Sequence, residues 1–389
     1  MLKQILLAIT IICLFASSLI IIQEPATVGS FRGGYPIHGY ILVGGQNGTW
    51  FTNGQYAKLY KINLEDLERV NLGPDGTTGQ GTVWSGGWNG KEWLVAGWGV
   101  NSGVNGSNPY LYQYDGKRQI DTSAESQFAA ESSWRGGDVF AVSFNGHEWL
   151  LSGLGSGYLS GYGDDNHMSL ATFNGSTFKD FSNKVPDQGD YILYANAWNG
   201  KYWLVGGGLA VNGVLFSFTD SATKDLTNEI RDAVPSFGAV QAIAWNGVIW
   251  LIGGDHFLAS FDGFRFHDLT SSLLKPLGLS EYALSVNSIV WNQGTWIIGG
   301  GITRARVGFQ SAWLVEFNAY GVHRLPLPAQ MNEGKASILS VAAVGSLIVA
   351  GGYTGNHGVL VTYLSGDVGD ISYVIQNDMS YVNWVAVNS

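Results

Sequence analysis

The chain has 389 residues, including 55 glycines, and 46% of its residues are hydrophobic while only 13% are charged. Because disordered chains combine low hydrophobicity with high charge, this composition excludes a largely disordered protein. The net charge of −10 has the wrong sign for neutralising phosphates and argues against a nucleic-acid partner.

The first element in chain order is an uncharged apolar stretch from Ile5 to Ile22, which follows Lys3. As a helix this stretch would be about 27 Å long, which is enough to cross the hydrocarbon core of a bilayer. We therefore expect residues 1–25 to be a signal peptide or an uncleaved membrane anchor, followed by a linker at 26–38 and an exported body. The single cysteine, Cys13, lies in this stretch, so the exported body has no disulfide and no cysteine nucleophile.

A repeated unit fills the exported body. Each unit contains a hydrophobic strand that ends in glycine, and the last glycines are Gly45, Gly97, Gly153, Gly207, Gly254, Gly300 and Gly352. Their spacing averages about 51 residues, which lies in the range of propeller repeats. An alternating strand ending in an aromatic residue and Asn-Gly comes before it, as in Ala195–Gly200, and two shorter strands come after it. The repeat predicts four-stranded antiparallel blades.

The two ends of the body complement each other. The first unit lacks its own first strand, and Trp384–Ser389 at the end of the chain has the pattern of that missing strand. Closing the ring removes the unpaired edges that an open array would expose. We therefore predict an all-β, seven-bladed β-propeller at residues 39–389, with Tyr381–Ser389 completing blade 1.

These repeats resemble the kelch family and the galactose-oxidase-type propellers. The shared features are the Gly-Gly pairs at 44–45, 206–207, 253–254, 299–300 and 351–352, and an aromatic residue followed by Asp or Asn at the end of the third strand. The resemblance covers residues 40–389 and implies a seven-bladed ring. Blades 2 and 3 depart from it with Ala96-Gly97 and Ser152-Gly153. The copper site of galactose oxidase needs a cross-linked cysteine, which the exported body cannot supply.

Tryptophan is abundant, and nine of the 15 tryptophans recur within the repeat. If Asn199-Gly200 forms a two-residue turn, Trp198 and Trp203 are diagonal neighbours on one sheet face, opposite the small Ala195 and Ala197. Such a pattern predicts a core between blades for Trp88, Trp93, Trp149, Trp198, Trp203, Trp245, Trp250, Trp291 and Trp296. More exposure is expected for Trp50, Trp84, Trp98, Trp134, Trp313 and Trp384.

In a propeller, the connections between strands 2 and 3 share one face with the linkers between blades, and binding sites commonly gather on such loops. The long loop between Gly153 and Ser169 carries Asp164, Asp165 and Asn166, which predict either a Ca²⁺ site or a solvated polar loop. Asp255-His256 follows Gly254 directly and is either an oriented base or a tight turn. The candidate binding residues are Trp50, Trp98, Trp134, Asp164, Asp165, His167, Asp255, His256, Arg304 and His357.

Three glycosylation sequons begin at Asn47, Asn105 and Asn174. They predict glycosylated surface turns in an exported protein, although Asn-Gly turns followed by Ser or Thr also arise by chance in so Asn-Gly-rich a chain.

No P-loop, HExxH motif or nucleophile elbow occurs in the sequence. We therefore expect an extracellular, membrane-anchored propeller that acts as a binding or scaffold module for a protein or a glycan at the cell surface. No cofactor other than calcium is expected. The alternative is a secreted carbohydrate-active enzyme with its site on the 2–3 loop face, where acids such as Asp190 and Asp255 face the axis beside exposed tryptophan.

Overall fold

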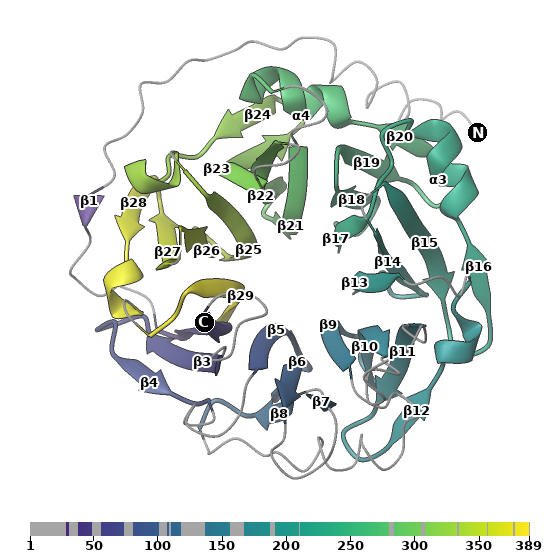
Figure 1. Ribbon diagram of the computed structural model, residues 1–389, viewed down its shortest axis with the longest axis horizontal. Coiled ribbons are helices and arrows are strands. Elements are labelled where there is room, and N and C mark those ends of the chain that lie inside the picture. The colour runs from purple at the N-terminus through teal and green to yellow at the C-terminus, as the bar shows by residue number, and fades with distance from the viewer. Residues whose placement is uncertain are drawn as a thin grey trace.

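Seven β-sheets are arranged as blades around a central axis (Figure 1). The computed structural model describes residues 29–30, 38–48, 56–73, 81–100, 107–108, 110–117, 137–155, 167–186, 191–209, 211–279, 284–304, 308–332, 334–355, 357–375 and 378–388. The first strand of each blade lies nearest the axis, and neighbouring first strands contact each other all the way round the ring. The predicted seven-bladed propeller is confirmed.

From the axis outward, the strands of the first four blades are as follows. Blade 1 has β29 (Tyr381–Asn388), β2 (Tyr40–Asn47), β3 (Tyr56–Asn63) and β4 (Arg69–Asn71). Blade 2 has β5 (Gly81–Trp88), then β6 (Trp93–Val100), and outside it the short β7 (Ser107–Asn108) and β8 (Leu111–Tyr114), which both pair with β6. Blade 3 has β9 (Gly137–Phe144), β10 (Trp149–Gly155), β11 (His167–Phe173) and β12 (Phe178–Asp180); blade 4 has β13 (Ile192–Trp198), β14 (Trp203–Leu209), β15 (Asn212–Phe218) and β16 (Thr223–Asp225).

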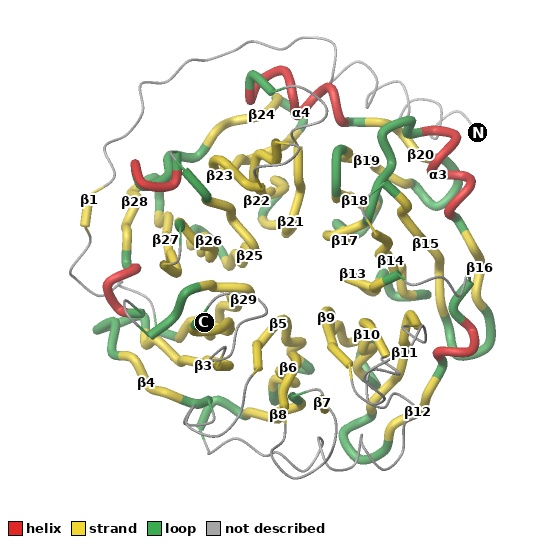
Figure 2. The backbone as a smooth tube through the Cα atoms, in the orientation of Figure 1, coloured by secondary structure: helices red, strands yellow, loops and turns green. Residues whose placement is uncertain are grey.

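The remaining blades have the same order. Blade 5 has β17 (Val240–Trp245), β18 (Trp250–Gly254), β19 (Phe257–Phe261) and β20 (Phe266–Asp268); blade 6 has β21 (Leu284–Asn292), β22 (Thr295–Arg304), β23 (Gly308–Asn318) and β24 (Gly321–Arg324). Blade 7 has β25 (Ala336–Val344), β26 (Leu347–Thr354), β27 (His357–Leu364) and β28 (Asp367–Asp370), and β1 (Gly29–Ser30) pairs in parallel with β28. The short helices α3 (Thr227–Ala233), α4 (Thr270–Leu277), η2 (Ser182–Lys184), η4 (Ala329–Met331) and η5 (Ser372–Val374) lie at the perimeter (Figure 2).

The C-terminal strand closes the ring. β29 pairs antiparallel with β2, from Tyr40↔Asn388 to Gln46↔Tyr381. Blade 1 is therefore made from both ends of the propeller, as the sequence predicts, and closure leaves no unpaired inner strand at the junction.

Seven hydrophobic clusters lie among the described residues, and each draws its members from two neighbouring blades. The cluster between blades 3 and 4 contains Trp203, which is 2% exposed, and Trp198 packs against it. The repeat tryptophans are thus interblade core, as predicted. Trp313 and Trp384 are buried as well, so the greater exposure expected for them is wrong; both pack in clusters between blades.

The hairpin between strands 1 and 2 is longer than predicted. Trp198 pairs directly with Trp203, with ring centroids 4.5 Å apart, and the Asn199 N–H donates to the Tyr202 carbonyl oxygen. The turn therefore spans Asn199–Tyr202, and the prediction of a two-residue turn with diagonal tryptophans is wrong. The Asn199 Oδ1 atom explains why asparagine begins this turn, because it accepts hydrogen bonds from the N–H groups of Lys201 and Tyr202 at 2.9 Å each.

The glycine pairs lie inside the second strands because the first strand of the same blade bulges beside them. A Cβ on Gly207 would lie 1.9 Å from the carbonyl oxygen of Ile192 in the bulged strand. A Cβ on Gly206 would lie 2.6 Å from Val240 Cγ1 in the next blade. The second glycine therefore makes room for the bulge, and the first makes room for the neighbouring blade.

Candidate functional site

A β-bulge in each first strand places one extra residue at the same level of all seven blades. We call these residues the axial ring: Trp84, Phe140, Tyr194, Gln241, Asn287, Leu339 and Asn383. All of them except Asn383 keep part of their solvent-exposed surface, although the residue before each one is fully buried. Bulges often re-aim a side chain next to a functional site, so the axial ring is the best candidate site among the described residues.

The axial ring has an aromatic side. The rings of Trp84 and Phe140 have centroids 5.1 Å apart, and Phe140 makes an edge-on contact with Tyr194 at 5.2 Å. These three residues, which we call the aromatic arc, come from adjacent blades 2, 3 and 4. Side chains from three blades thus form one continuous aromatic surface.

Amide side chains occupy much of the other side. Asn287 Nδ2 donates to the Ser337 hydroxyl at 2.8 Å and to the Ile338 carbonyl oxygen at 2.7 Å, which ties blade 6 to blade 7. Asn383 Nδ2 donates to the Val83 carbonyl oxygen at 3.4 Å, whereas its Oδ1 atom is buried and has no hydrogen-bond partner in the part of the chain that the structure describes. One acceptor of the axial ring is therefore unsatisfied.

Asp138 lies two residues before Phe140, at the start of β9. It keeps part of its accessible surface, but protein atoms surround its carboxyl group, and this burial raises the pKa of Asp138 to about 7. Burial also raises the pKa of Tyr194 to about 12, with smaller contributions from the charges of Asp255 and Asp138. Tyr194 is thus protonated at neutral pH and lies in the field of two carboxyl groups.

Asp255 and His256 form the connection between strands 2 and 3 of blade 5. His256 has φ 73° and its N–H donates to the Leu284 carbonyl oxygen at 2.8 Å, so this turn joins blade 5 to the first strand of blade 6. Burial raises the pKa of Asp255, while the nearby His256 and the hydrogen bond from the Ser285 hydroxyl, at 3.4 Å, lower it. The predicted turn is present, and its carboxyl group belongs to the surroundings of Tyr194.

Of the other predicted site residues, Trp98 and His357 have described side chains. Trp98 is half-buried in β6 opposite Thr82, and His357 is exposed at the start of β27, the third strand from the axis. His167 begins β11 and Arg304 ends β22, but their side chains lie outside the described residues. The positions that fall wholly outside the described residues are Trp50, Trp134, Asp164, Asp165, Asn166, Asp190 and the sequon Asn105.

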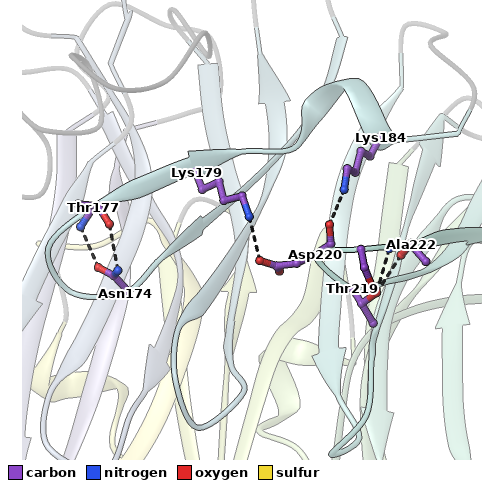
Figure 3. A network of polar contacts seen from close by, with 8 residues as sticks. Asn174, Thr177, Lys179, Lys184, Thr219, Asp220 and Ala222 are labelled. Atoms are coloured by element: carbon purple, nitrogen blue, oxygen red, sulfur yellow. Dashed lines mark hydrogen bonds and ion pairs between the residues drawn. The ribbon is translucent and has the colours of Figure 1, made fainter.

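Two sequons lie in described turns. Asn47 is half-buried at the end of β2, where its Oδ1 atom accepts the Gly48 N–H at 2.9 Å. Asn174 is exposed in the 3–4 turn of blade 3, and its Nδ2 atom donates to the Thr177 hydroxyl at 2.9 Å (Figure 3). Beside it, Lys179 pairs with Asp220 of blade 4 at 3.1 Å. Asn174 is therefore at an accessible place, but its amide is held in the turn.

A groove of about 760 Å³ lies between blades 6 and 7. It is lined by the turns between strands 1 and 2, so it is on the opposite face from the 2–3 connections. Two pairs of polar groups lie in it: His323 with Glu316 at 3.5 Å, and the Tyr363 hydroxyl with the Pro326 carbonyl oxygen. Its lining also includes Gln293, Arg324 and Asn332, none of which belongs to the axial ring.

Within the described residues, no cluster of three or more His, Cys, Asp or Glu side chains is arranged to hold a metal ion. The same part of the chain contains no helix with the length and apolar character needed to span a bilayer.

Sequence reasoning named Trp84 only for its expected exposure and missed Phe140, Tyr194 and Asp138. A signal for the first three exists: a buried aliphatic residue, a variable residue and a small residue recur in the first strands, as in Val83-Trp84-Ser85, Val139-Phe140-Ala141 and Leu193-Tyr194-Ala195. The variable position is the axial ring. Asp138 has no such signal, because its raised pKa comes from burial in the folded protein.

No protein-family model matches the sequence, and no curated protein is significantly similar to it. Solved structures do match. An acylaminoacyl peptidase from Pyrococcus horikoshii is similar at 11% identity and a TM-score of 0.50, over 86% of this chain and 52% of that one. The β-propeller domain of the Trilobed protease from Pyrococcus furiosus is similar at 12% identity and a TM-score of 0.47, over 86% of this chain and 98% of that one. At these identities the likeness shows the β-propeller fold alone.

Proposed function

We propose that the chain is an extracellular, membrane-anchored, kelch-like propeller that acts as a binding or scaffold module for a protein or a glycan at the cell surface. The apolar stretch from Ile5 to Ile22 supports the anchor, and the glycine pairs support the kelch-like assignment. The observation that carries the binding function is the axial ring: a partly exposed aromatic arc beside Asp138 and Asp255.

The aromatic arc suits a binding surface. Aromatic side chains supply a large contact area at low entropic cost and are enriched at binding hot spots. Trp84, Phe140 and Tyr194 contact one another in series, so the three rings are held by their neighbours before a ligand arrives. Preorganisation of this kind reduces the entropy lost on binding.

Binding is tested with the full chain, in detergent or in membranes, against arrays of glycans and of cell-surface proteins. Phe140→Ala is expected to weaken any specific binding by at least ~10-fold, the usual size of a hot-spot loss. Phe264→Ala is the matched control, because Phe264 is 89% exposed and lies in the 3–4 turn of blade 5. Binding that both variants retain in full would rule out the axial ring as the site.

Protease treatment of intact cells tests the location. The propeller is expected to be digested or released from outside the cell, with the N-terminal stretch left in the membrane fraction. Complete protection in intact cells, followed by digestion after lysis, would contradict the proposed location.

A carbohydrate-active enzyme is the second candidate, and Asp138 is the observation that favours it. A carboxyl group with a pKa of about 7 is still partly protonated at neutral pH and can act as a general acid, with Asp255 as the second carboxylate. Glycoside hydrolysis that Asp138→Asn abolishes would support this candidate. A broad panel of glycosides left unhydrolysed by the full chain would count against it.

A further inference from the structure

The axial surface carries very little charge. The seven first strands β5, β9, β13, β17, β21, β25 and β29 all lie within the described residues, and their sequences contain no Lys, Arg or His. Asp138 is the only charged residue in these strands. Among the described residues of the inner strands, no cation balances this carboxylate, and the field of an unbalanced carboxylate attracts a cation.

Hydrogen-bond acceptors lie near the aromatic arc. An ionised Asp138 or Asp255 only accepts hydrogen bonds, and the Oδ1 atom of Asn383, a side chain only 7% exposed, has no partner among the described residues. Asn383 is the axial-ring residue of blade 1, next to Trp84 of blade 2. A ligand that donates several hydrogen bonds and carries positive charge would satisfy this set.

We propose that the aromatic arc, together with Asp138 and Asp255, binds a primary alkylammonium group, namely a lysine side chain of a partner polypeptide. The cation would lie against the faces of the arc, where ring quadrupoles attract positive charge, and the carboxylates would supply the counter-charge. The apolar stem of lysine suits the rings, whereas a sugar would need more hydrogen-bonding groups than the arc offers. This inference rests on the proposed binding function and names its ligand chemistry.

The raised pKa of Asp138 makes a pH dependence of alkylammonium binding expected. Burial raises its pKa by disfavouring the charged carboxylate, and a bound ammonium would bring the pKa down again. The titratable groups around it are Tyr194, whose pKa is raised to about 12, and Asp255 with the adjacent His256. Affinity for an alkylammonium is therefore expected to fall as the pH is lowered from 8 to 5.

The test uses the full chain and ligand-observed NMR titration. The first two probes are Nα-acetyl-lysinamide and its Nε-acetylated form, which differ in the charge and N–H donors of the terminal group. Two further probes are n-butylamine and glucosamine. The variants are Asp138→Asn and Phe140→Ala. The matched controls are Asp232→Asn, an exposed carboxylate on α3, and Phe264→Ala.

The charged lysinamide is expected to bind at least ~10-fold more tightly than its acetylated form, the gain of a desolvated cation–π contact with a counter-ion. Asp138→Asn should remove most of that difference, while Asp232→Asn should not. Tighter binding of lysinamide than of butylamine supports a polypeptide as the source, and equal binding supports a free amine.

Equal affinity for the charged and acetylated probes would overturn the inference, as would tighter binding of glucosamine than of lysinamide. If the ammonium probes fail but Phe140-dependent binding to the glycan or protein arrays remains, this inference fails and the binding function stands. If Phe140→Ala changes no binding at all, both fail.

Discussion

The first strands of the blades carry two sets of side chains that differ in kind although they are neighbours in sequence. The residues that face the previous blade are all aliphatic and fully buried: Val83, Val139, Leu193, Val240, Val286, Ile338 and Val382. The axial-ring residue that follows each one is aromatic, amide or aliphatic, and all but Asn383 are partly exposed. The seven first strands therefore share an aliphatic residue where blades pack together, but they differ in the residue that forms the axial surface. Packing between blades thus does not determine which residue types occupy the axial ring.

The largest expected effect on stability is at Gly207, the glycine that makes room for the bulge of the first strand in blade 4. In Gly207→Ala, the new Cβ would lie 1.9 Å from the backbone oxygen of Ile192, which cannot move without undoing the bulge. We expect a loss of about 4 kcal/mol or more in the free energy of unfolding, measured by chemical denaturation.

Gly206→Ala is the matched comparison, because its Cβ would meet the Val240 side chain at 2.6 Å rather than backbone. Val240→Gly removes both side-chain atoms that this Cβ would meet, Cγ1 at 2.6 Å and Cβ at 2.8 Å, so a double-mutant cycle should show strong coupling between residues 206 and 240 but none between 207 and 240. A Gly207→Ala protein as stable as the parent would show that the bulge does not require glycine.

The next effect concerns Asp138 on the axial side. Its folded-state pKa, about 7, is raised above the ordinary value of 3.8, so the folded state holds a proton that the unfolded state releases between those values. The stability from this group is fully present below about pH 4 and is lost as the pH rises through 7. Asp138→Asn should therefore stabilise the protein at pH 8 by less than about 4 kcal/mol, the limit set by a three-unit shift with some water access.

Thermal and denaturant unfolding at pH 5 and pH 8 measure this difference. The gain from Asp138→Asn should be larger at pH 8 than at pH 5, and Asp232→Asn should show no such dependence. An equal effect of Asp138→Asn at both pH values would mean that the carboxyl group is not desolvated in the fold.

The sequence was sufficient for the ring but not for its axial surface. Closure by the C-terminal strand was predictable because the pairing of β29 with β2 completes a pattern that every other blade contains. Asp138 could not be separated from other aspartates, because its raised pKa depends on burial by the assembled ring. Trp313 shows the same limit: it falls outside the repeat, yet it is fully buried between blades 5 and 6.

The smallest expected effects compare a hydrogen bond between blades with the axial ring. Ser340, which follows Leu339 of the axial ring, accepts the Val385 N–H of blade 1 at 3.1 Å, so Ser340→Ala leaves a buried donor unsatisfied and should cost about 1–2 kcal/mol. Gln241 is half-exposed on the axial ring, and Gln241→Ala should change stability by less than about 0.5 kcal/mol. Denaturant midpoints of the two variants, at unchanged m-value, measure both. If Gln241→Ala lowers the free energy of unfolding as much as Ser340→Ala does, the axial ring contributes to packing between blades. The variation among its seven residues would then no longer indicate a functional surface.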